Sequence, residues 1–160
     1  MTWFDAVTLL LIVAIIWLES TRGFGRALFD AVGAIIALKV SQFAAKPLAE
    51  AIPVLSGAAT NEAFWLATVF VVLAVLVVIA SRFLYETTLL SLDVLDPVVG
   101  GILGAVCGLV SAHVLLRTLL LAYGQSDAAK VLLGSFVGHE LLQFRTFHTV
   151  VTALQNLGSW

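Results

Sequence analysis

Residues 63–81 read AFWLATVFVVLAVLVVIAS, an apolar run bounded by Glu62 on one side and Arg82 on the other. About 20 predominantly apolar residues are enough for an α-helix to cross the hydrocarbon core of a bilayer. No residue within the run carries a charge, and it holds neither glycine nor proline. The stretch therefore predicts a membrane-spanning helix over residues 63–81.

Three further apolar stretches occupy residues 3–18, 25–45 and 98–123. The first has a tryptophan near each end, where indole side chains favour the membrane interface. The second is interrupted by Asp30 and Lys39. The third is preceded by an aspartate and a proline, which commonly begin a helix. Together with residues 63–81, these stretches predict about four transmembrane helices.

Beyond residue 123 the pattern becomes amphipathic, and we expect an amphipathic tail over about residues 127–157. Polar side chains occupy much of one side of this segment, and apolar side chains recur at helical spacing on the other. The apolar positions are Leu141, Phe144, Phe147, Val151 and Leu154. This pattern is typical of a helix that lies on the membrane surface.

The composition agrees with a membrane location. Of the 160 residues, 61% are hydrophobic and only 11% are charged, whereas roughly a quarter are charged in an ordinary soluble domain. A chain this short has too much surface to hide the surplus of apolar side chains in a water-facing core. The net charge of −2 excludes a broad basic face for nucleic acid. We expect an all-α integral membrane protein, one domain over residues 1–160, with the lipid bilayer as its surroundings.

Small residues at intervals of four follow two of the predicted helices. Helices in a membrane associate by close packing, and small residues let their backbones approach. The residues in question are Gly33, Ala37 and Ser41 in the second helix and Gly100, Gly104 and Gly108 in the fourth. We interpret both rows as helix-packing seams.

The second predicted helix carries a carboxylate on its seam. At 3.6 residues per turn, Asp30 shares its face with Ala37 and Ser41 and points into the packed seam rather than at lipid. Such a group needs a partner or a function, and Arg26, one turn earlier, is the nearest candidate partner. A structural ion pair near the interface and a role in an ion or proton path are both open. Lys39 lies about half a turn away and can extend to the interface.

His113 and Arg117 lie one turn apart on the fourth predicted helix. They can form a polar patch that faces a neighbouring subunit or a water-filled cavity. Alternatively, Arg117 reaches the interface and His113 forms a local hydrogen bond. Both interpretations remain open from the sequence.

Motifs for enzymatic chemistry are weak or missing. The sequence HELLQ at residues 139–143 approaches the zinc-protease pattern, but Gln143 stands where the second histidine ligand is needed. Ser111 and His113 are two residues apart on a helix, so their side chains diverge and cannot form a nucleophile–base pair. We expect no catalytic residues, no metal site and no cofactor, and therefore no enzymatic activity.

Three short motifs carry a resemblance to a known family: MTWFD at residues 1–5, RGFGR at 22–26 and DPVVG at 96–100, the last followed by Gly104 and Gly108. In order and spacing, over nearly the whole chain, they resemble the colicin V production protein family of bacterial inner-membrane proteins. The polar and glycine positions within these motifs are Asp5, Arg22, Gly23, Arg26 and Asp96. This chain departs from the family at Pro97 and Cys107, where the family often has arginine.

The resemblance implies four membrane helices and support of toxin production, without an established molecular activity. We therefore expect a non-enzymatic, multi-pass protein of the bacterial inner membrane that supports toxin production or envelope processes through membrane partners. Those partners are further copies of the chain or other membrane proteins. The alternative is a subunit of an oligomeric channel or transporter, in which Asp30, His113 or Arg117 lines a path.

Overall fold

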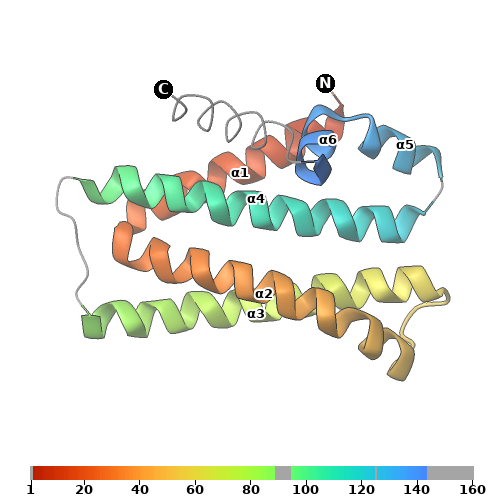
Figure 1. Ribbon diagram of the computed structural model, residues 1–160, viewed down its shortest axis with the longest axis horizontal. Helices are drawn as coiled ribbons and strands as arrows, with labels where there is room; N and C mark the ends of the chain where they lie inside the picture. Colours follow the sequence, from red (N-terminus) through yellow and green to blue (C-terminus); the bar gives the residue numbers. More distant parts are fainter. Residues whose placement is uncertain (1, 89–94, 125, 144–160) are drawn as a thin grey trace, which may run out of the picture.

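The computed structural model describes residues 2–88, 95–124 and 126–143. Four long helices lie side by side in this part of the chain and alternate in direction along the bundle (Figure 1). They are α1 (Trp3–Arg22), α2 (Phe24–Ala51), α3 (Ala58–Thr88) and α4 (Asp96–Tyr123). All four are long and apolar enough to cross a membrane, which confirms the predicted all-helical membrane fold.

The helices extend beyond the spans predicted from hydrophobicity. Helix α1 ends at Arg22 rather than residue 18, and α2 continues through Pro47 to Ala51 rather than stopping at 45. Helix α3 begins at Ala58 and ends at Thr88, well outside residues 63–81. The differences arise because an apolar run marks the part of a helix in hydrocarbon, whereas the backbone remains helical into the polar interface.

The bundle consists of two helix pairs. Helix α1 packs mainly on α4 and α2 packs mainly on α3, while α4 also contacts both α2 and α3. In Figure 1, α1 and α4 form the upper pair and α2 and α3 the lower pair. Helix α1 has little contact with α2, its neighbour in sequence. Helix α4 is therefore the element that joins the two pairs.

Small residues allow the close contact between α1 and α4. A Cβ atom added to Gly104 would lie 2.8 Å from Cβ of Glu19 and 3.0 Å from Cα of Ile16. One added to Gly108 would lie 3.1 Å from Cα of Ile12, and one added to Gly100 would lie 2.8 Å from the Glu19 carbonyl oxygen. The glycine seam of α4 thus meets the backbone of α1, and larger side chains cannot be accommodated without separating the two helices.

The seam of α2 has other neighbours. A Cβ atom on Gly33 would collide with the side chain of Val77 in α3. Ala37 is buried and belongs to a small apolar cluster with Phe70 of α3 and Val114 of α4. Ser41 is also fully buried, and its hydroxyl group donates a hydrogen bond to the backbone of its own helix. The α2 seam therefore packs within the second pair and against α4.

Asp5 anchors the beginning of α1. Its Oδ2 atom accepts a hydrogen bond of 2.8 Å from the backbone N–H of Thr2, and the Thr2 hydroxyl accepts one from the Asp5 backbone. This reciprocal arrangement is a capping box. Its Oδ1 atom accepts a 3.0 Å hydrogen bond from the backbone N–H of Val137. Asp5 thus joins the first turn of the bundle to the C-terminal segment.

Of the predicted amphipathic tail, residues 127–143 lie within the described part of the chain. Residues 127–143 form two short helices, α5 (Asp127–Leu133) and α6 (Phe136–Gln143), separated by a break at Gly134. Leu132, Val137 and Leu141 pack with Phe4 and Leu116 into a core cluster of buried residues. These apolar side chains thus cover the bundle. The predicted apolar positions from Phe144 onward lie outside the described residues.

One buried polar side chain closes the connection between α2 and α3. The Asn61 amide group donates to the carbonyl oxygen of Ala49 at 2.6 Å and accepts hydrogen bonds from the backbone of Val54 and Leu55. Backbone groups in a short loop need such partners when water is excluded. Asn61 therefore holds the end of α2 against the start of α3.

Two glycines of α4 provide a matched test of the seam. Gly104→Ala should lower the midpoint of thermal unfolding in detergent, because its Cβ would lie 2.8 Å from Glu19. Gly101→Ala should leave the midpoint unchanged or raise it, because the nearest atoms lie 3.8 Å away and alanine favours helix by about 1 kcal/mol. Equal midpoints for the two variants would contradict the close contact.

Candidate functional site

Three charged side chains meet at the end of the bundle where α1 joins α2. The Nη1 atom of Arg22 lies 2.8 Å from Oε1 of Glu19 and 3.3 Å from Oδ2 of Asp30. Both carboxylate side chains are only 5% exposed, while that of Arg22 is 21% exposed. The two acidic groups are therefore held inside the bundle by one guanidinium group, which reaches towards the surface.

The turn between α1 and α2 creates this arrangement. Gly23 has a φ of +83°, a conformation that side chains with a Cβ rarely adopt, and α2 starts at the next residue. A Cβ atom on Gly23 would also lie 3.3 Å from Oδ2 of Asp96, at the start of α4. The abrupt reversal sets Arg22, at the end of α1, beside Asp30 in the second turn of α2.

The same end of the molecule brings together two of the motifs noted in the sequence. The hydroxyl group of Ser20 donates a 2.9 Å hydrogen bond to the carbonyl oxygen of Pro97. Asp96 lies against Gly23, and Gly100 lies against the Glu19 backbone. Residues 22–26 and 96–100 are thus neighbours in space, whereas Asp5 lies at the opposite end of α1.

A cavity of about 180 Å³ extends from the charged cluster into the bundle. Phe70 and Ala74 of α3 are among its apolar lining residues, and Cys107 and Ser111 of α4 also line it. Oε2 of Glu19 and Oδ1 of Asp30 are buried and have no hydrogen-bond partner among the described residues. The cluster holds two carboxyl groups and one guanidinium group, so binding one proton or one monovalent cation makes it electrically neutral.

The predicted partner of Asp30 is wrong. Asp30 is buried, as its position on the seam suggested, but its carboxylate pairs with Arg22 rather than with Arg26. The Nε atom of Arg26 is buried without a hydrogen-bond partner among the residues described. The helix-periodicity argument considered only α2 and could not include the tight turn that places α1 beside it.

Glu19 was missed as a site residue. A signal existed, because Glu19 and Arg22 are three residues apart on one helix, a spacing at which opposite charges interact. The spacing does not reveal that Glu19 is buried. Glu19 is only 4% exposed, because it lies under the glycine seam of α4.

His113 and Arg117 do not join the charged cluster. They lie further along α4 and line a different groove, shared with Lys39 and Gln42 of α2. Arg117 is exposed at the outside of the bundle. The structure therefore separates the acidic site containing Asp30 from a basic groove.

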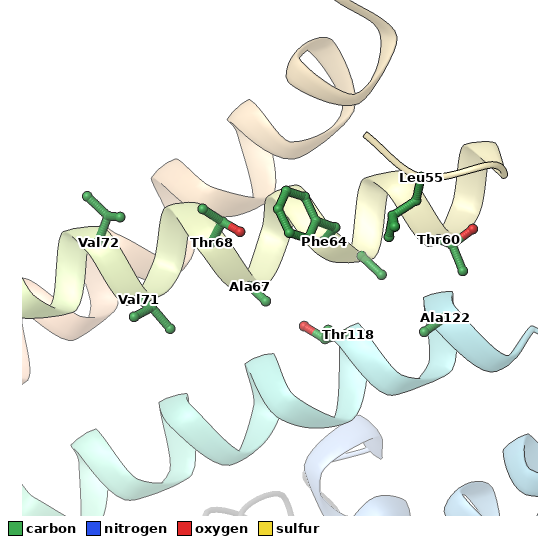
Figure 2. A pocket seen from close by; sticks show the side chains of 10 residues that line it. Leu55, Thr60, Phe64, Ala67, Thr68, Val71, Val72, Thr118 and Ala122 are labelled. Atoms are coloured by element: carbon green, nitrogen blue, oxygen red, sulfur yellow. The ribbon is translucent and has the colours of Figure 1, made fainter. Parts of the chain in front are cut away.

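An open apolar groove lies between α3 and α4 (Figure 2). It has a volume of about 560 Å³. Ala67 and Val71 of α3 point towards α4, which contributes Thr118 and Ala122, whereas Val72 points away from α4 in this view. The labelled α3 side chains are Thr60, Phe64, Ala67, Thr68, Val71 and Val72. The hydroxyl oxygen of Thr118 is buried and has no hydrogen-bond partner within the described segments.

These features define a multi-pass helical membrane protein by helix length and composition. Within the described ranges, no group of three or more histidine, cysteine, aspartate or glutamate side chains could hold a metal ion. Comparisons of the chain with protein-family models, with curated proteins and with solved structures gave no match.

Replacement of Arg22, whose guanidinium group pairs with both carboxylates, tests the charged cluster. Arg22→Met leaves two buried carboxyl groups without a counterion and should lower the free energy of unfolding in detergent by about 3–5 kcal/mol. Arg82→Met is the matched control, because Arg82 forms an exposed ion pair with Glu86 and should cost no more than about 1 kcal/mol. If Arg22→Met were as stable as the control, the cluster would not hold α1 and α2 together.

Proposed function

We propose that the chain is a non-enzymatic protein of the bacterial inner membrane that supports toxin production or another envelope process by binding membrane partners. The process and the membrane rest on the resemblance of its motifs to the colicin V production family. The mode of action rests on one observation, the open groove between α3 and α4. This groove is where the bundle can receive a further transmembrane helix.

The lining of the groove suits a helix better than it suits lipid tails alone. Ala67 and Ala122 leave room for a backbone to approach, as small residues do at helix contacts within membranes. The hydroxyl oxygen of Thr118 is buried without a partner among the described residues, and rotation about χ1 would let it form an interhelical hydrogen bond, which stabilises such contacts. The occupant that fits is therefore a transmembrane helix with a polar group opposite Thr118, supplied by another membrane protein.

Filling the groove tests this function. Ala67→Leu should abolish crosslinking to the partner in native membranes and should fail to restore the process in a deletion strain. Val75→Leu, at an exposed position of α3 outside the groove, should retain both. Thr118→Val keeps the shape of the side chain and should weaken crosslinking only in part.

The thermal midpoint of each purified variant separates loss of binding from loss of folding. Wild-type behaviour of a folded Ala67→Leu protein in both assays would contradict the proposal. Crosslinks between copies of the chain alone would replace the external partner with a homo-oligomer.

A second candidate function is ion transport, and the Glu19–Arg22–Asp30 cluster favours it. Ionisable groups within membrane helices commonly mark ion paths and proton relays. Here two carboxyl groups compete for one arginine beside a cavity, so a proton or small cation can be exchanged without exposing a bare charge to lipid. The ion path would lie within a single bundle rather than between the chains of an oligomer.

Flux into liposomes tests the second candidate. Purified wild-type protein should carry protons or a monovalent cation, and Asp30→Asn should reduce the rate at least tenfold because one binding carboxylate is lost. Glu86→Gln is the matched control, since Glu86 lies in an exposed ion pair and should behave as wild type. No flux above empty liposomes would exclude transport of the tested ions.

A further inference from the structure

The groove between α2 and α4 has a polar end and an apolar end. It encloses about 530 Å³ and opens on the outside of the bundle. Its polar side chains are Lys39, Gln42, His113 and Arg117, and its apolar ones include Ile35, Val106 and Leu109. Among the described residues, no carboxylate lines it.

The polarity of the groove changes along the membrane normal. Helices α2 and α4 run in the same direction (Figure 1). Their residue numbers therefore increase together along the groove, from Ile35 and Val106 towards Gln42 and Arg117. On α4, Val106 lies near the middle of the helix and Arg117 nearer its end, whereas on α2 both Ile35 and Lys39 lie close to the middle. A lipid molecule in one leaflet likewise has its apolar acyl chains towards the middle of the membrane and its polar headgroup towards the surface.

The depth of the basic residues requires a counterion. At about 1.5 Å per residue, Arg117 lies ~9 Å before the end of α4 and Lys39 lies ~18 Å before the end of α2. Both helices are ~42 Å long against a hydrocarbon thickness of about 30 Å. Arg117 is therefore near the interface, while Lys39 lies close to the middle of α2 and its side chain extends outwards. Neither side chain forms an ion pair within the described part of the chain.

We propose that this groove binds an anionic phospholipid. The lipid phosphate lies between Lys39 and Arg117, with Gln42 and His113 as further hydrogen-bonding groups, and one acyl chain lies along Ile35 and the neighbouring apolar residues. Basic pockets between transmembrane helices bind anionic headgroups in this way. The inference does not depend on the partner-binding function, which uses the opposite face of α4.

Other occupants fit the groove less well. A second copy related by twofold symmetry would place the same surface against itself and bring Lys39 and Arg117 of both copies together. A free anion would satisfy the basic end and leave the apolar end without a counterpart. The α3–α4 groove of Figure 2 has a similar volume, but none of the described residues that line it is charged, so these residues offer no headgroup site.

Lipid retention measured by native mass spectrometry tests the proposal. Wild-type protein in mixed micelles with equal phosphatidylglycerol and phosphatidylcholine should retain phosphatidylglycerol selectively. The double variant Lys39→Gln with Arg117→Gln should bind it about thirtyfold more weakly, because each basic group contributes roughly fivefold. The matched control is Arg82→Gln with Lys130→Gln, which removes the same charge from two exposed ion pairs and should bind like wild type.

A third variant separates the lipid from other anions. Val106→Phe fills the apolar end and should release the lipid although both basic residues remain. Excess inorganic phosphate should not displace the lipid from wild-type protein. Equal retention of the two lipids by wild type, or equal loss in the two double variants, would overturn the proposal. So would displacement by phosphate, or a dimer that dissociates when Lys39 and Arg117 are replaced.

Discussion

The contact of α4 with the backbone of α1 determines how the polar groups of this bundle are arranged. Gly104 has no side chain, so α1 approaches until Cβ of Glu19 would lie only 2.8 Å from an added Cβ atom. That approach buries Glu19, and a buried carboxylate within a membrane needs a cation. Arg22 supplies the cation and also pairs with Asp30 of α2. A packing contact between two helices thus specifies an ionic contact with a third.

The turn at Gly23 allows α1 to pack on α4 and, at the same time, to form its ionic contact with α2. Because α2 starts directly after a residue with positive φ, α1 and α2 share the charged cluster although they have little contact along the rest of their lengths. Helix α2 is then free to pack on α3, and α4 joins the two pairs. Packing in lipid gains little from apolar contact alone, so the turn, the glycines and the ion pairs carry much of the specificity.

The apolar runs of the sequence were sufficient to predict four helices and the seam positions, since hydrophobicity and small-residue spacing are local properties. The partner of Asp30 was not a local property. Arg26 is closer on the same helix, but the Gly23 turn brings Arg22 nearer in space. Within the described part of the predicted amphipathic tail there are two short helices, and apolar spacing alone does not reveal that Leu141 packs on the bundle.

The cavity beside the charged cluster is closed at its inner end by apolar packing. Phe70 lines the cavity and packs with Ala37 and Val114, and the basic groove containing His113 lies on the outer side of α2 and α4. An ion at Glu19 and Asp30 would therefore have access from one side of the bundle in this conformation. Transport through the cluster would require α4 to move relative to α2 at the Ala37–Phe70–Val114 contact. A role confined to partner binding requires no such motion, so mobility at this contact distinguishes the two functions.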